Sequence, residues 1–274
     1  MTIHLNVDST AYSVDLDHPI DISIALHFNG EQPNTYNVPK ATERAYEDSV
    51  FIGDTRRGGS CNFEEYKLIP HCNGTHTEGV GHITHQRISI HSILRQSFIP
   101  ATFITVKPEQ ALETPDSYTP AKTKDDMLIT CKGLSTVLQN PLPGFLKGLI
   151  IRTLPNDESK KSRDYMKYPP PFLSLEAMQY IVELGVEHLL VDIPSLERMF
   201  DEGKLSTHRL FWNVPLGSHD IDPQHHSMKT VTEMIYVPIE VPDGRYLLDL
   251  QIPAFVANAA PSRPILYPVR EAKA

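Results

Sequence analysis

Residues 72–82, Cys-Asn-Gly-Thr-His-Thr-Glu-Gly-Val-Gly-His, restrict the fold more than any other stretch of this chain. Cys72, His76, Glu78 and His82 carry thiol, imidazole and carboxylate groups, which are the side chains that bind zinc and its first-row neighbours. All four lie at even separations, so a straight strand would place them on one face. Four residues along a strand span ~13 Å, however, which is too far for two ligands of one ion.

A helix would bring Cys72 and His76 together, but Asn73-Gly74-Thr75 is poor helical sequence. The remaining solution is a sharply bent strand, for which glycines at 74, 79 and 81 supply the conformational freedom. Residues 72–82 are therefore predicted to hold converging metal ligands. The spacing leaves an alternative open, because clustered histidines on a turn are often exposed and inert.

Apolar runs rich in β-branched residues indicate buried strands elsewhere in the chain. They cover Ile20–Leu26, Phe103–Val106, Leu149–Thr153, Leu189–Ile193 and Tyr246–Ile252. One helix is clear: Ser174 can cap it, an apolar stripe follows, Gly185 ends it, and a strand comes next. We therefore expect an α/β fold, with a mixed sheet and flanking helices, in a single domain over residues 1–274.

The net charge of −9 argues against a nucleic-acid-binding protein, since no basic surplus is available to neutralise phosphates. No apolar run approaches the ~20 residues that a membrane-spanning helix needs. Residues 1–8 lack the basic region and apolar core of a secretory signal, and three cysteines are too few for a disulfide framework. We expect a cytoplasmic protein that binds neither membrane nor nucleic acid.

The segment resembles the His-x-Gly-Thr-His-x-Asp-x-x-x-His pattern of the cyclase family of metal-dependent hydrolases, which includes bacterial kynurenine formamidases. Cys72 stands at the first His of the pattern and Glu78 at its Asp, while Gly74-Thr75-His76 and His82 match. Further stretches that resemble family landmarks follow in the family's order: Asp21-Ile22-Ser23, residues 148–153, Val191–Ser195, Thr207–Leu210, Glu233–Ile235, Leu250–Pro253 and Pro261–Pro264. The resemblance spans Ile20 to Val269, with the largest insertions near 108–144, 156–171 and 212–229.

The resemblance implies one or two divalent ions held by Cys72, His76, Glu78, His208 and Glu233. A carboxylate at Glu78 could bridge two ions, and a thiolate ligand would favour zinc, with manganese as the alternative. Taken singly, His208 would be a packing residue and Glu233 would face water. The polar loop with His219, His225 and His226 is expected to line or cover a cleft; a second metal site there is the weaker alternative.

The implied activity is hydrolysis of a C–N bond in a small amide, formamide or cyclic amide, as in an arylformamidase, by metal-activated water. His82 is the candidate general base and acid. Gln32 and Tyr36 are the expected substrate contacts, although kynurenine formamidases have an aromatic residue where this chain has Gln32 before Pro33. The resemblance also implies a homodimer or homotetramer. The competing hypothesis is a non-catalytic module of the same fold that binds a ligand or metal at a degenerate site.

Overall fold

A computed structural model describes residues 1–272 as a single domain built on one large mixed sheet. The strands of this sheet run in the order β1-β2-β16-β14-β7-β10-β12-β13-β6-β15, and β3 pairs with β16. Their bounds are β1 Thr2–Val7, β2 Thr10–Asp15, β3 Ile20–Asp21, β6 His76–Glu78, β7 Phe98–Val106, β10 Gly148–Thr153, β12 His188–Val191, β13 Thr230–Glu233, β14 Gly244–Asp249, β15 Ala259–Pro261 and β16 Ile265–Glu271.

Within this sheet, the four central strands β7, β10, β12 and β13 pair in parallel, and the strands on either side run antiparallel. The α-helices are short: α1 Pro70–Asn73, α2 Ile90–Ile93, α3 Cys131–Val137, α4 Leu175–Glu183 and α5 Ser206–Trp212. Single 3₁₀ turns are η1 Thr55–Arg57, η2 Val80–His82, η3 Ala111–Glu113, η4 Pro143–Phe145 and η5 Glu158–Ser162. None of the helices within residues 1–272 is long and apolar enough to cross a membrane.

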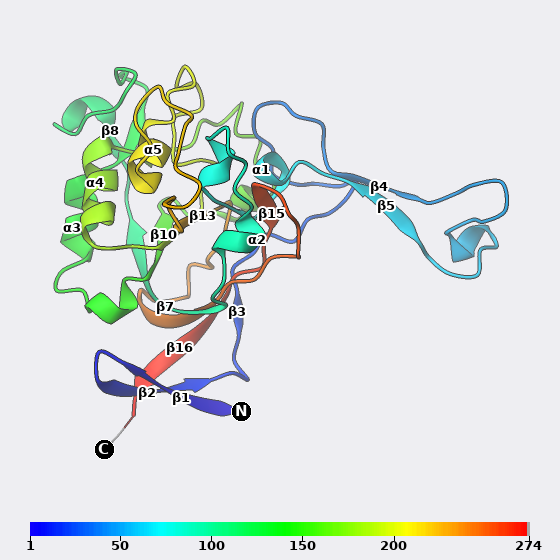
Figure 1. Cartoon of the computed structure of the whole chain (residues 1–274), viewed down its shortest axis with the longest axis horizontal. Coiled ribbons are helices and arrows are strands. Elements are labelled where there is room, and N and C mark those ends of the chain that lie inside the picture. The colour runs from blue at the N-terminus through cyan, green and yellow to red at the C-terminus, as the bar shows by residue number, and fades with distance from the viewer. Residues whose placement is uncertain (273–274) are drawn as a thin grey trace.

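Successive side chains along the central strands point to opposite faces of the sheet, so the core has two layers. Leu149 and Ile151 of β10 pack into the cluster that α3, α4 and α5 cover, whereas Ile150 belongs to the cluster on the opposite face. The three helices stand together beside the central strands in Figure 1. A sheet buried on both faces explains why the central strands read as continuous apolar runs.

The expected helix and the strand after it are confirmed. Ser174 Oγ accepts a hydrogen bond from the Ala177 N–H at the start of α4, and Gly185 adopts φ +75° just past its end. The buried residues Ala177, Met178 and Ile181 form the stripe that faces the sheet. The mixed α/β fold in one domain is therefore confirmed.

The predicted strand Ile20–Leu26 is wrong beyond Asp21. The Asp21 carboxylate accepts hydrogen bonds from both the backbone N–H and the hydroxyl of Ser23, and this local turn takes the chain out of the sheet. A polar side chain that bonds its own backbone ends the strand, although the apolar residues continue.

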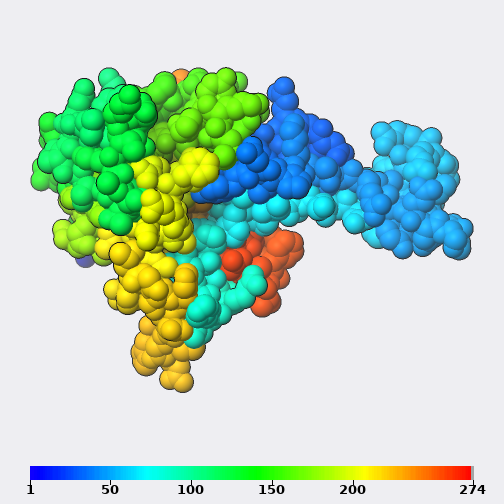
Figure 2. Space-filling view, turned by 90° about the horizontal axis from the view of Figure 1, so that it is seen from above, coloured from blue at the N-terminus to red at the C-terminus, as the bar shows by residue number. Residues whose placement is uncertain are grey.

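Two smaller sheets lie outside the central one. The three-stranded sheet β11-β9-β8 joins β8 Glu109–Gln110, β9 Met127–Ile129 and β11 Phe172–Leu173. The hairpin of β4 Thr42–Ala45 and β5 Glu64–Lys67 projects from the body as an arm in both Figure 1 and Figure 2. The arm was not expected from the sequence.

His188, at the start of β12, makes folding sensitive to acid. Burial, together with the nearby Lys147, lowers its pKa from 6.5 to about 4, and its Nδ1 lies 2.8 Å from Thr230 Oγ1. The unfolded chain binds the proton more readily, so stability falls as the pH drops from about 6.5 toward 4, by about 3 kcal/mol in total.

We expect His188→Asn to reduce the loss of stability as the pH drops from about 6.5 toward 4. Thermal midpoints measured from pH 4.5 to 7.5 should fall less steeply for His188→Asn than for the wild type. Leu189→Ala is the control, since it opens a core cavity at every pH and keeps the histidine. Equal slopes for the wild type and His188→Asn would contradict this assignment.

Candidate metal centre

Residues 70–82 bend as expected, but they do so as a helical turn, a short strand and a second turn. The single turn α1 ends at Gly74, β6 pairs with β13 and β15, and η2 places His82 after another reversal. His76 and Glu78 lie two residues apart on β6 and therefore point to the same side of the sheet.

The glycines serve close packing more than backbone freedom. A Cβ atom at Gly79 would lie 2.5 Å from Ile93 Cδ1, and one at Gly81 would lie 2.1 Å from the Ile88 carbonyl oxygen. Neither residue adopts the left-handed conformation that favours glycine. At these two points the neighbouring chain lies directly against the backbone, which leaves no room for a larger side chain.

Five side chains form two groups that share Glu78. The inner group is His76, Glu78 and Glu233, all buried, and its ligand atoms lie within 4.8 Å of one another. The outer group is His71, Glu78 and His82, whose imidazoles are about one quarter exposed. Register explains the inner group, because Glu233 on β13 lies directly opposite His76 on β6.

His208 reaches the inner group from α5, which covers this end of the sheet. Its Nε2 lies 3.1 Å from Glu78 Oε1 and 3.5 Å from Glu233 Oε1. Glu233 Oε1 is itself held by a hydrogen bond from the Leu196 N–H. The structure thus brings together four of the residues expected to bind metal: His76, Glu78, His208 and Glu233.

The hydrogen bonds fix which nitrogen of each inner imidazole faces the carboxylates. Nδ1 of His76 bonds the Gly74 carbonyl oxygen at 3.0 Å, and Nδ1 of His208 bonds Glu197 Oε1 at 2.9 Å. These oxygens only accept, so each Nδ1 carries a proton and Nε2 is the nitrogen that faces the carboxylate oxygens. A cation bound between Nε2 and the carboxylates would take the place of a second proton on the ring.

Two buried polar atoms at this point have no hydrogen-bond partner, His76 Nε2 and Glu78 Oε2. The latter lies 2.9 Å from His71 Nδ1, but the contact lacks the alignment of a hydrogen bond. Unpaired buried donors and acceptors are costly, and a divalent cation would satisfy both atoms. The residues present therefore fit a divalent metal ion.

The electrostatics point the same way. Burial alone would raise the pKa of Glu78, yet His82, His208 and His71 hold it well below its usual value. Burial alone would lower the pKa of His208, but its hydrogen bonds to Glu197, Glu233 and Glu78 raise it well above the usual range. The inner group therefore favours positive charge at the place where His208 Nε2 faces the carboxylates.

Cys72 does not join the metal-binding groups among the described residues. Its side chain is buried, and burial together with Glu233 and Glu78 raises the pKa of the thiol to about 11. His71 takes part instead. On a straight strand His71 would face the other way and would be an alternative first ligand only if the backbone twists; the single turn of α1 supplies that twist and directs His71 toward Glu78.

Gln32 and Tyr36, the two expected substrate contacts, differ in whether their polar groups are already bonded within the protein. The Gln32 amide is committed to its own loop, since Nε2 donates to the His27 and Ala41 carbonyls and Oε1 accepts from the Ala41 N–H. Tyr36 is nearly half exposed and has φ +55°. Partial burial of its hydroxyl, with the charges of Glu233 and Asp201, raises its pKa to about 12.

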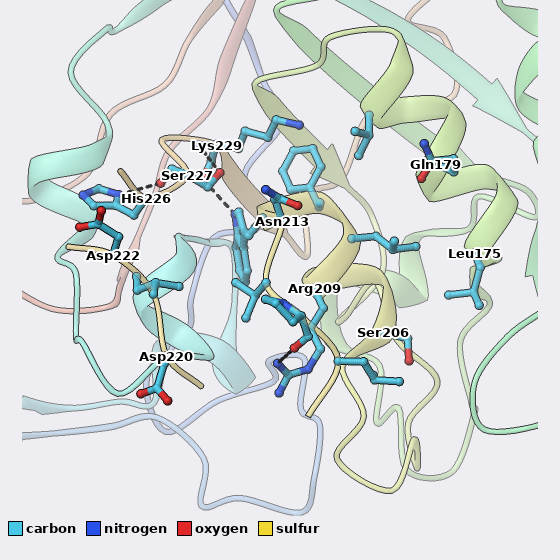
Figure 3. A pocket seen from close by; sticks show the side chains of 18 of the residues that line it. Leu175, Gln179, Ser206, Arg209, Asn213, Asp220, Asp222, His226, Ser227 and Lys229 are labelled. Carbon is cyan, nitrogen blue, oxygen red and sulfur yellow. Dashed lines mark hydrogen bonds between the residues drawn. The ribbon is translucent and has the colours of Figure 1, made fainter. Parts of the chain in front are cut away.

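The polar loop of residues 212–229 lies along the segment that follows His82. His219 Nδ1 donates to the Ile83 carbonyl, and the His85 N–H donates to the His219 carbonyl. His225 pairs with Asp222 at the exposed surface. A groove of about 860 Å³ runs between this loop, α4 and α5 (Figure 3), and none of the metal-centre residues lines it.

Comparison with known proteins identifies the family of the chain. Residues 14–198 match the model of the family described as "Putative cyclase". No curated protein matches the chain. Among solved structures, isatin hydrolase A from Labrenzia aggregata is 14% identical with a TM-score of 0.60, covering 91% of this chain and 93% of its own.

Two further solved structures have the same fold. An isatin hydrolase bound to the product analogue thioisatinate is 13% identical, with a TM-score of 0.57 and coverage of 92% of this chain and 93% of its own. A "predicted metal-dependent hydrolase" from Bacillus stearothermophilus is 15% identical, with a TM-score of 0.57 and coverage of 91% and 98%. The family match covers more than half of the sequence, and the chain belongs to the cyclase family.

Proposed function

We propose that this protein is a metal-dependent hydrolase that cleaves a C–N bond in a small amide, formamide or cyclic amide. The observation that carries the proposal is the pair of imidazoles, His76 and His208, whose Nε2 atoms face the buried carboxylates of Glu78 and Glu233. These four residues would hold one divalent ion.

The ligand set bears on the choice of metal. The expectation of zinc rested on a thiolate from Cys72, and Cys72 lies outside both groups. Two imidazoles and two carboxylates suit zinc and also manganese. We propose zinc, with manganese as the competing ion, and metal analysis of protein purified without chelator decides between them.

A divalent ion bound here would supply Lewis-acid chemistry, polarising a carbonyl and lowering the pKa of water to about 7. His82 stands at the outer edge of the centre, with Nε2 3.8 Å from Glu78 Oε2. Burial lowers its pKa, against the opposing effect of Glu78, so the ring is neutral near pH 7 and can accept a proton. We assign His82 as the base that takes a proton from water and returns it to the leaving nitrogen.

Tyr36 carries the proposed contact to substrate, since the Gln32 amide is already bonded. Two of the structural relatives are isatin hydrolases, so a cyclic amide is a natural first substrate to assay.

A second ion held by His71, Glu78 and His82 would occupy the proposed base; a stoichiometry of two ions per chain would therefore overturn the role given to His82. A homodimer or homotetramer stays a prediction, which light scattering tests.

The inner group predicts that metal stabilises the protein. At a metal concentration one hundred times the dissociation constant, binding adds about 2.7 kcal/mol, which for a chain of this size raises the melting temperature by about 5–10 °C. Glu78→Gln should abolish the increase, because it removes a charge shared by both groups. Glu183→Gln, at the exposed end of α4, is the control and should keep it. An increase of the same size in Glu78→Gln would contradict the proposed centre.

The role of His82 predicts a separation between binding and turnover. His82→Ala should lower hydrolysis of isatin, N-formylkynurenine or a simple aryl formamide by about 10²–10⁴-fold while the metal-induced increase in melting temperature survives. The exposed His85, mutated to Ala, should keep full turnover. Wild-type protein that binds metal but hydrolyses none of these substrates would favour the non-catalytic module.

A further inference from the structure

A buried chain of hydrogen bonds leads from His208 away from the metal centre to Tyr118. Glu197 Oε1 accepts hydrogen bonds from both the backbone N–H of His208, at 2.8 Å, and its Nδ1, at 2.9 Å. The other oxygen, Glu197 Oε2, accepts from the Tyr118 hydroxyl at 2.6 Å. All three side chains are at least 95% buried.

The hydroxyl of Tyr118 has no freedom to bond elsewhere. It accepts a hydrogen bond from the Arg198 N–H at 3.1 Å, so its own proton is directed to Glu197. The ring packs against Phe172, with centroids 4.6 Å apart, and the Arg198 guanidinium lies 5.8 Å from its centre. The phenol is therefore held at its ring and at its oxygen.

The backbone around Tyr118 is anchored to the two helices beside the centre. Ser117 bonds the Glu176 carboxylate in the first turn of α4 through both its N–H and its hydroxyl, at 2.6 Å each. Ser206, the first residue of α5, donates from its hydroxyl to the Thr119 carbonyl at 2.9 Å. Tyr118 is thus fixed relative to the helix that carries His208.

We propose that Tyr118 and Glu197 are positioning residues of the metal centre, an inference that rests on the proposed function. Tyr118 holds the Glu197 carboxylate in the one orientation that receives both N–H groups of His208. Glu197 in turn keeps the His208 proton on Nδ1 and directs the Nε2 lone pair at the space between Glu78 and Glu233. Partners of this kind orient a histidine ligand and increase its basicity.

Removal of the phenol oxygen isolates this effect from packing. Tyr118→Phe keeps the ring against Phe172 and leaves Glu197 Oε2 buried without a donor, so that the carboxylate is free to rotate and His208 loses its fixed orientation. Glu197→Gln keeps the size of the side chain but removes the charge opposite Nδ1. Neither variant changes a residue of the inner or outer group.

The test is the affinity of each purified variant for Zn²⁺ and Mn²⁺, measured by competition with a chelating dye. Tyr118→Phe and Glu197→Gln should each bind about 10–100-fold more weakly than the wild type. The matched control is Tyr246→Phe, which loses a hydroxyl-to-carbonyl hydrogen bond of 2.7 Å to Pro242, far from the centre in the fold, and should bind metal as the wild type does. The visible spectrum of the Co²⁺-loaded protein should change in the two variants and not in the control.

Melting temperatures without metal identify a purely structural effect. If Tyr118→Phe and Tyr246→Phe lose similar stability and both keep wild-type affinity and Co²⁺ spectrum, the positioning role is wrong. That result leaves the proposed hydrolase intact, because the wild type still binds metal. Wild-type protein that binds neither ion would instead overturn the proposed function, and the positioning role with it.

Discussion

Three carboxylates buried in one place, Glu78, Glu197 and Glu233, are the constraint on which this end of the molecule depends. An isolated ionised carboxylate is expensive to bury, and like charges close together increase the cost. Each oxygen therefore needs a donor or a cation. Histidine N–H groups meet part of this need, Glu78 Oε2 is left for a cation, and the chain must supply those histidines from several elements at once.

Some of these side chains come from the sheet, and the others come from the helix and turns that surround it. Antiparallel pairing of β6 with β13 sets His76 opposite Glu233 and leaves Glu78 two residues further along the same face. The short strand alone cannot complete the set, because a flat sheet presents its side chains in parallel rows. The helix α5, which packs across the strand ends, supplies His208 from the opposite side, and the turns flanking β6 bring in His71 and His82.

The sequence predicts regular elements best where local signals agree. Ser174, the apolar stripe and Gly185 all mark the same helix, so α4 and the strand after it are as expected. Ile20–Leu26 has the composition of a strand, but the Asp21–Ser23 turn outweighs it. The bend predicted within residues 72–82 is present and brings His76 and His82 to Glu78, but not Cys72. The spacing could not show that α1 is helical, and that one turn decides that His71, and not Cys72, points at Glu78.

Glu197 and Tyr118 lie beyond what residue spacing can reveal. Glu197 follows the Asp192–Ser195 stretch by two residues, and nothing local shows that its carboxylate turns toward His208. Tyr118 lies in the 108–144 segment, predicted to be an insertion, where tertiary contacts alone bring it to Glu197. A motif read along the chain can thus identify the residues that would face a cation, but Tyr118 comes from a segment with no metal-binding signature. In the proposed arrangement, affinity for the ion depends on how this segment packs as well as on the motif itself.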